Sequence, residues 1–220
     1  MGRRFLITGS GIGVGKTTVG CALGFAFRAR AMRVGVMKPA ETGCAEVGGE
    51  LEALDARALA LAAGSPLPLE LICPHRYRSR LAPAAAAELD HLPPPNLADI
   101  ARRFHEIAAA SDSVLVESAG GIATPITWNA DFADLASLLG LEVIVVIGVR
   151  LGWMNAGILT LKYAESRGLT IAGYILCHVE PDALPHDETN EAFTRLTIAH
   201  YLGRMRYREP LAKAIVEALL

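Results

Sequence analysis

The sequence predicts an α/β fold in which a mostly parallel β-sheet is covered by helices on both faces. Short apolar stretches, typical of buried strands, alternate with longer stretches of helix formers. A glycine-rich loop, 9–15, separates the first predicted strand from the first predicted helix. Hydrophobic residues make up 52% of the chain and charged residues 20%, which is typical of a globular core. We expect a single domain over residues 1–220.

The first three elements are a strand, a helix and a strand. An apolar run over 4–8 predicts a buried strand that ends at the glycines following it. Small apolar residues over 16–30 predict a helix that packs closely on the sheet. A second apolar run over 33–38 predicts the next strand. Because parallel strands end at the same edge, ligands are expected beyond their carboxyl ends.

The middle of the chain is less regular. Helix formers over 50–63 predict a helix that ends at Gly64. Prolines and arginines are frequent between 64 and 95, which predicts a long crossing segment with one short alanine-rich helix after Pro83. The strand and helix alternation then resumes, with helices over 97–110, 131–139 and 155–167 and strands over 113–117, 142–148 and 169–177.

Charge and cysteine usage exclude several classes of protein. Lys and Arg number 21 against 23 Asp and Glu, so no basic field is present to hold nucleic acid. The apolar run 143–149 is far shorter than the roughly 20 residues of a membrane-spanning helix, so we expect no membrane partner. The four cysteines lie far apart without a C-x-x-C pair, which predicts neither a zinc ribbon nor a disulfide framework. A cytoplasmic location is expected.

The glycine-rich loop has the setting of a phosphate-binding P-loop. Residues 9–17 read Gly-Ser-Gly-Ile-Gly-Val-Gly-Lys-Thr and lie between a predicted strand and a predicted helix. Glycines let backbone N–H groups converge on phosphate oxygens, and a helix N-terminus adds a positive partial charge. Lys16 is expected to reach the β- and γ-phosphates, and Thr17 to bind Mg²⁺. The nucleotide ligands expected in this segment are Gly11, Ile12, Gly13, Val14, Gly15, Lys16, Thr17 and Thr18.

Charged residues at two strand ends extend this site. Lys38 ends the second predicted strand, over the same sheet edge as the P-loop, although a solvated surface lysine is an equal alternative. Glu117 ends an apolar strand, where nucleoside triphosphatases hold their metal or its water; the alternative is a glutamate in solvent. Asp55 lies inside a predicted helix and by itself indicates a surface acid.

These motifs, in this order and over nearly the whole chain, resemble those of dethiobiotin synthetases. That family's loop also has five residues between the positions of Gly9 and Gly15, one more than the common P-loop pattern. Lys38-Pro39 followed by Thr42-Gly43 is similar to its Lys-Pro element. The segments 116–121 and 150–155 resemble its Val-Glu-Gly-Ala-Gly-Gly and Lys-Leu-Gly-Cys-Ile-Asn.

The resemblance implies an enzyme that closes the ureido ring of dethiobiotin. In that reaction 7,8-diaminononanoate captures CO₂ as a carbamate, ATP phosphorylates the carbamate, and the second amine displaces phosphate. The implied catalytic residues are Lys16, Lys38 and Thr42, which would stabilise the carbamate and the transferred phosphoryl group. The implied Mg²⁺ ligands are Thr17, Asp55 and Glu117.

The resemblance also implies a homodimer. In the family, the segment equivalent to 150–155 comes from the neighbouring subunit and holds the substrate. The implied substrate contacts are Lys38, Thr42, Pro83, Arg150, Gly152 and Asn155. Asn155 also precedes an apolar helical pattern, so it is equally a helix N-cap candidate.

Four departures from the family pattern stand out. Gly11 replaces an aspartate of the loop, and Arg80 and Ala84 replace a proline and a histidine. Cys177-His178 replaces an asparagine pair that recognises adenine, and Arg206 ends a segment that replaces Gly-x-Ile-Pro. Cys177, His178 and Arg206 are therefore expected beside the nucleotide base. There they indicate loose nucleotide selection or the use of a nucleotide other than ATP, and the alternative is an adenine held by backbone groups.

Three other functions stay open. A partitioning ATPase of the same fold usually has a second lysine near the loop start, where this chain has Ser10 and Gly11. A related amide-forming ligase usually carries a further glutamine-hydrolysing domain, and an inactive nucleotide binder would not require Lys38. The remaining histidines show no metal-ligand spacing and are expected at the surface; they are His75, His91, His105, His186 and His200.

Overall fold

The centre of the molecule is a six-stranded sheet with the order β12-β11-β10-β1-β7-β2, in which every neighbouring pair is parallel. This computed structural model describes residues 2–181 and 187–220. The strands are β1 (Arg4–Gly9), β2 (Val34–Met37), β7 (Ser113–Glu117), β10 (Glu142–Gly148), β11 (Ile171–Cys177) and β12 (Tyr201–Met205). The predicted parallel sheet is confirmed.

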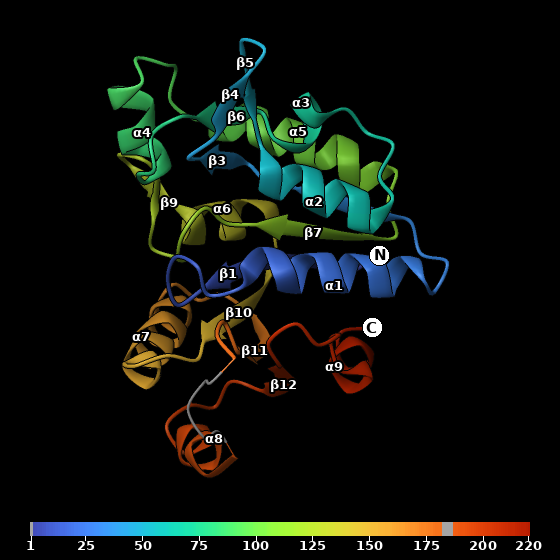
Figure 1. The fold of residues 1–220 in the computed structure, drawn as a ribbon, viewed down its shortest axis with the longest axis vertical. Coiled ribbons are helices and arrows are strands. Elements are labelled where there is room, and N and C mark those ends of the chain that lie inside the picture. Colours follow the sequence, from blue (N-terminus) through green and yellow to red (C-terminus); the bar gives the residue numbers. More distant parts are fainter. Residues whose placement is uncertain (1, 182–186) are drawn as a thin grey trace.

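Helices cover both faces of this sheet, as predicted. Apolar residues of α1 (Lys16–Arg28), α2 (Leu54–Ala63) and α9 (Lys213–Ala218) form one core cluster with the sheet. Those of α5 (Leu97–Ala109), α6 (Phe132–Leu139), α7 (Trp153–Ser166) and α8 (Asp187–Thr194) form the other. Figure 1 shows α7, α8 and α9 gathered around the β10–β12 half, and α2 to α5 around the other half.

Strand β1 shows why both faces are apolar. Side chains of successive strand residues point to opposite faces, and here Phe5 and Ile7 pack in one cluster while Leu6 packs in the other. All three are fully buried. A continuous apolar strand is therefore what a sheet covered on both faces requires.

The predicted and observed starts of a helix agree best where a capping side chain is present. Asn96 accepts a hydrogen bond from the Asp99 N–H at 3.1 Å and begins α5. Asp131 and Asp134 form a capping box at the start of α6. Helix α7 starts at Trp153, two residues earlier than expected, and its N-cap is Gly152 with φ 85°. The N-cap interpretation of Asn155 is therefore wrong.

A hairpin replaces the first part of the helix expected over 50–63. Strands β4 (Ala45–Val47) and β5 (Glu50–Glu52) pair antiparallel. Gly48 and Gly49 between them have φ values of 63° and 87°, the backbone of a two-residue hairpin turn. Helix α2 consequently begins only at Leu54. The helix prediction is wrong over 50–53, because the Gly-Gly turn outweighs the helix propensity of Glu and Leu.

The crossing segment contains more structure than expected. The short alanine-rich helix after Pro83 is confirmed as α4 (Pro83–Leu89). Helix α3 (Leu69–Ile72) and strand β6 (His75–Tyr77) precede it, and β6 pairs in parallel with β3 (Ala40–Thr42). A small hairpin of β8 (Pro125–Thr127) and β9 (Ala130–Asp131) follows β7. Within 2–181 and 187–220, no helix has the length and apolarity needed to cross a bilayer.

Candidate active site

The P-loop follows β1 and wraps around the start of α1. Its backbone conformation requires glycine at two positions, since Gly13 and Gly15 have φ values of 67° and 93°. Gly15 is the N-cap of α1 and has no side chain, so the N-cap residue itself makes no side-chain hydrogen bond to the first turn of the helix. The Ser10 N–H is anchored to the Val146 carbonyl of β10 at 2.9 Å. The loop therefore presents a helix N-terminus suited to an anion.

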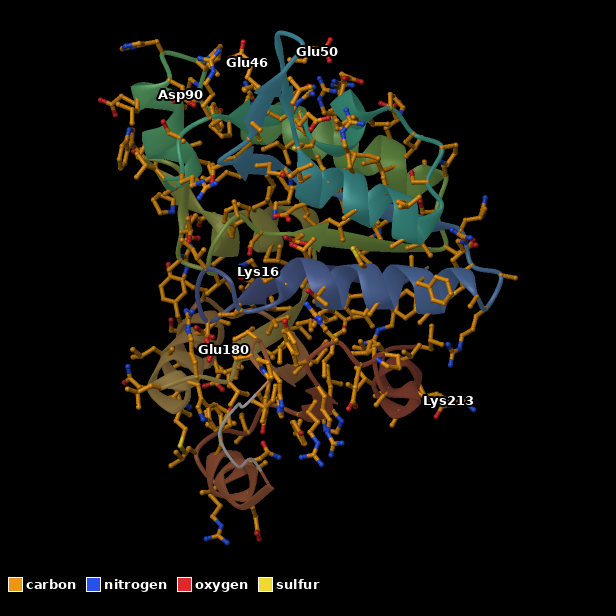
Figure 2. The ribbon with its side chains drawn as sticks, in the orientation of Figure 1. Lys16, Glu46, Glu50, Asp90, Glu180 and Lys213 are labelled. Atoms are coloured by element: carbon orange, nitrogen blue, oxygen red, sulfur yellow. The ribbon has the colours of Figure 1, made fainter. Side chains whose placement is uncertain are left out.

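Lys16 lies folded back onto this loop. Its side chain is buried, and its Nζ donates to the carbonyl of Gly11 at 2.9 Å. The pKa of Lys16 is lowered to about 8, first by burial and then by the nearby Lys38, while Glu117 and Asp55 oppose the shift. Figure 2 shows Lys16 at the start of α1, where the loop meets the helix. The Lys16 ammonium could therefore donate to a phosphate oxygen in place of the Gly11 carbonyl.

Lys38 and Glu117 form the buried centre of the site. The Lys38 ammonium donates to Oε1 of Glu117, and their side chains are 3% and 1% exposed. It also donates to Asp55 Oδ2 at 3.1 Å and to the Ser118 carbonyl at 3.3 Å. The alternatives of a solvated lysine and a solvated glutamate are therefore wrong. Burial would lower the pKa of Lys38, but the carboxylates outweigh it and hold that pKa above its usual range.

Oxygen donors suited to Mg²⁺ meet beside the P-loop. The Thr17 hydroxyl donates to Glu117 Oε1 at 2.9 Å. Glu117 Oε2 is buried and has no hydrogen-bond partner, while the Asp55 side chain is 44% exposed. A hydroxyl and two carboxylates fit a hard cation that takes its other ligands from phosphates and water. Across residues 2–181 and 187–220, no group of three or more His, Cys, Asp or Glu side chains is placed to hold a metal ion.

The residues predicted beside the base lie at the ends of β11 and β12. Cys177 is opposite Met205, and the His178 N–H donates to the Met205 carbonyl at 2.9 Å. Arg206 follows directly and is exposed. Cys177 is buried against Gly15 of the P-loop, and burial raises the pKa of its thiol to about 11. The structure thus brings the base-side segment to the phosphate loop.

The predicted substrate contacts do not all lie together. Thr42 lies half-buried in β3, and Pro83 is buried at the start of α4, which packs against β3. The Arg150 guanidinium donates to the Ile12 carbonyl of the P-loop of its own chain at 3.2 Å. Gly152 and Asn155 lie exposed at the start of α7.

The sequence interpretation missed Glu41, a buried carboxylate of β3. Its two oxygens accept from the N–H groups of Asp55 and Ala56, each at 2.9 Å. The N-cap of α2 is Ala53, which has no side-chain oxygen, so this helix start needs an acceptor from elsewhere. The sequence signal that could have indicated Glu41 is the absence of a capping residue at the start of α2.

The histidine prediction is mostly confirmed. His91, His105 and His200 are exposed, and His186 lies outside the described residues. His75 is half-buried instead, because its Nε2 accepts from the Asn96 N–H at 3.3 Å at the start of α5.

A strand, a phosphate loop, a helix and a strand-end carboxylate at one edge of a parallel sheet define a P-loop nucleoside triphosphatase fold. A family model described as an AAA domain matches residues 3–214. The chain belongs to the dethiobiotin synthetase family: it is 41% identical over 210 residues to the ATP-dependent dethiobiotin synthetase BioD of Anaeromyxobacter dehalogenans (strain 2CP-C), which covers 96% of this chain and 88% of the relative. The same-named protein of Aromatoleum aromaticum is 37% identical over 203 residues, covering 91% of this chain and 89% of that protein.

Solved structures with the same fold are more distant in sequence. The septum site-determining protein MinD of Pyrococcus horikoshii, complexed with Mg-ADP, has a TM-score of 0.57 at 17% identity, covering 99% of this chain and 86% of that one. The cell division ATPase MinD of Pyrococcus furiosus has a TM-score of 0.58 at 17% identity, covering 100% and 97%. At this identity the likeness shows the fold alone.

Proposed function

We propose that this chain is an ATP-dependent dethiobiotin synthase, a ligase of biotin biosynthesis. It would convert 7,8-diaminononanoate and CO₂ to dethiobiotin, through a carbamate and a carbamic-phosphoric anhydride. The observation that carries this proposal is the pair of buried ammonium groups of Lys16 and Lys38 beside the P-loop, close enough that Lys38 lowers the Lys16 pKa. Concentrated positive charge suits a reaction in which two anions, a carbamate and a triphosphate, must meet.

The steps balance without an external oxidant or reductant. One substrate amine attacks CO₂ and loses a proton, which gives the carbamate. A carbamate oxygen then attacks the γ-phosphorus of ATP, and ADP leaves. The second amine attacks the carbonyl carbon of the anhydride, a proton is lost, and phosphate leaves as the ring closes.

Each step places negative charge near a group of this chain. Lys16 would move from the Gly11 carbonyl to the phosphates and reach the attacking carbamate. Lys38, which is kept charged by its carboxylate neighbours, would stabilise the carbamate and the phosphoryl group in transfer. Thr42, half-buried in β3, would donate a hydrogen bond to the same oxygens. Because both lysines are already buried beside the P-loop, each would need only to exchange a hydrogen-bond partner during the reaction.

Thr17, Asp55 and Glu117 would hold Mg²⁺, which supplies charge neutralisation on the β- and γ-phosphates when it is bound. The partnerless Oε2 of Glu117 supports this assignment. The backbone of the loop over 11–18 would bind the phosphates, and Cys177, His178 and Arg206 would border the base.

A cytoplasmic homodimer is part of the proposal. Leu151 is 96% exposed, and Gly152 and Asn155 beside it are open to solvent, as a segment that serves a neighbouring subunit would be. Arg150 would reach the substrate from the rim of the P-loop, and Pro83 would border it near β3. The four cysteines are free thiols, which suits a reducing compartment.

Phosphate release by the purified protein tests the function. The assay contains Mg²⁺ and ATP, with and without 7,8-diaminononanoate and bicarbonate. We expect release only when the diamine is present, together with dethiobiotin detected by mass spectrometry. A related P-loop ligase or a switch ATPase is the alternative, since the fold is shared with MinD. Phosphate release that ignores the diamine would favour that alternative.

A further inference from the structure

Glu41 joins two segments that meet at the active site. It lies in β3, three residues after Lys38, and its side chain is 6% exposed. Both of its oxygens are used, one on the N–H of Asp55 and one on the N–H of Ala56, at 2.9 Å each. One carboxylate thus ties the segment that follows Lys38 to the first turn of α2.

The first turn of α2 depends on this contact. The first N–H groups of a helix have no intrahelical partner, and Ala53 at the N-cap position supplies no oxygen. A carboxylate at a helix N-terminus is also favoured by the helix dipole. Glu41 therefore performs from another segment the task that a capping residue performs locally.

The consequence for the site is the position of Asp55. Its backbone N–H is held by Glu41, while its side chain reaches Lys38 Nζ at 3.1 Å. Asp55 is only half-buried, so packing alone does not hold its carboxylate in place. The Lys38 ammonium and the backbone anchor on Glu41 are therefore the contacts that position it.

We propose that Glu41 is a positioning residue of the active site, which caps α2 and thereby fixes the Asp55 carboxylate as a ligand for magnesium bound with nucleotide. The proposal rests on the proposed function of Asp55 in metal binding. Removing a residue that orients a metal ligand through a hydrogen bond typically lowers metal affinity by roughly 10- to 100-fold. The charge of Glu41 also helps to keep Lys38 protonated.

A double-mutant cycle with ADP tests this proposal without turnover. Isothermal titration calorimetry gives the ADP affinity of the full chain with and without Mg²⁺ for wild type, Glu41→Gln, Asp55→Asn and the double variant. Glutamine keeps the shape but offers one acceptor in place of two. We expect Glu41→Gln to reduce the Mg²⁺ enhancement of ADP affinity roughly tenfold, leaving metal-free ADP affinity unchanged. In the Asp55→Asn background, the same change should cause less than about a twofold further loss.

Asn96→Ala is the matched control. It removes a helix cap of one hydrogen bond from α5, which is not part of the proposed site. We expect its thermal midpoint to fall by about 2–4 °C, as for Glu41→Gln, with no change in the Mg²⁺ enhancement. If Glu41→Gln does not fold, Glu41→Asp keeps the charge on a shorter side chain and should show a smaller loss in the same direction.

Two outcomes would overturn the proposal. One is a Glu41→Gln variant that behaves like Asn96→Ala, with lower stability and an unchanged Mg²⁺ enhancement. The other is a double variant in which the two losses multiply, since Glu41 would then act independently of Asp55. Because ADP binding needs no diamine, either result stands even if diamine-dependent phosphate release is absent.

Discussion

The phosphate end and the proposed base end of this nucleotide site are built differently. At the phosphate end, side chains contact one another in a buried network: Glu117 Oε1 accepts from both Lys38 and Thr17, and Lys38 also reaches Asp55. At the proposed base end, the His178 N–H that follows β11 donates to the carbonyl of Met205, the last residue of β12, and Cys177 packs against Gly15.

This difference accounts for the departures from the family pattern at Cys177, His178 and Arg206. A network of charged side chains tolerates few replacements, because removing one member leaves a buried charge without a partner. Backbone hydrogen bonds and packing contacts depend on shape more than on charge, so the side chains at the base end can be replaced more readily. The departures at Cys177, His178 and Arg206 fall at the proposed base end. At the phosphate end Lys16, Thr17, Lys38 and Glu117 match the pattern, although Gly11 of the loop departs from it.

Lys38→Met should have the largest effect, because it breaks the phosphate end at its centre. The change leaves Glu117 buried without its ammonium partner, so we expect a free energy of unfolding about 3 kcal/mol lower. Turnover should fall roughly 100- to 1000-fold, since a fixed cation is lost from the reacting centre. Mg²⁺ should restore part of the stability by supplying positive charge. Phosphate release and urea unfolding, with and without Mg²⁺, measure these effects.

Lys162→Met is the control for charge removal. Lys162 is exposed on α7 and paired with Glu165 at 2.8 Å, so its loss should change stability by less than about 0.5 kcal/mol and leave turnover intact. A Lys38→Met variant that keeps more than about a tenth of wild-type turnover would contradict the role given to Lys38.

The phosphate end could be predicted from the sequence largely because of its topology. Parallel strands end at one edge, so Lys38 and Glu117, each at a strand end, had to lie near the P-loop. The contacts of Asp55 could not be predicted by the same argument. They depend on where α2 begins, which is set by the Gly48-Gly49 turn and by Glu41. Glu41 lies beside a motif residue, but no local pattern shows that its carboxylate accepts from the N–H groups of Asp55 and Ala56, 14 and 15 residues further along the chain.

Gly15→Ala tests how closely the two ends are joined. Its new Cβ would lie 2.4 Å from Cys177 Sγ, and φ of 93° is unfavourable for alanine. Gly13→Ala is matched, because φ is 67° but nothing lies within 4 Å of its Cβ. We expect about 1–2 kcal/mol of destabilisation for Gly13→Ala and about 1–3 kcal/mol more for Gly15→Ala.

Cys177→Ala should then recover most of that additional loss in the Gly15→Ala background and none in the Gly13→Ala background. Urea unfolding of the four variants and wild type measures the coupling. Equal destabilisation by Gly13→Ala and Gly15→Ala would mean that Cys177 Sγ does not restrict the space for a side chain at position 15.

The pH dependence of nucleotide binding sharpens the description of the phosphate end. The pKa of Lys16 is lowered to about 8, so its charged fraction in the free protein falls as pH rises from 7 to 9. Phosphate binds the charged form, and the apparent affinity scales with that fraction. The dissociation constant for ADP should therefore rise about tenfold across this range. Adenosine, which carries no phosphate, should bind independently of pH; a flat profile for ADP would place the Lys16 pKa well above 9.

Nucleotide selection should show the smallest effect, and it tests the base end directly. Strong discrimination requires buried polar groups that a wrong base leaves unpaired. Cys177 is a neutral buried thiol, and Arg206 is exposed, so neither provides such a group. We expect ATP, CTP and GTP to bind within about fivefold of one another, as measured by calorimetry with Mg²⁺. Arg206→Ala should weaken all three alike. A preference for ATP above about 100-fold would show instead that backbone groups of the β11–β12 edge recognise adenine, and the base end would then be as specific as the phosphate end.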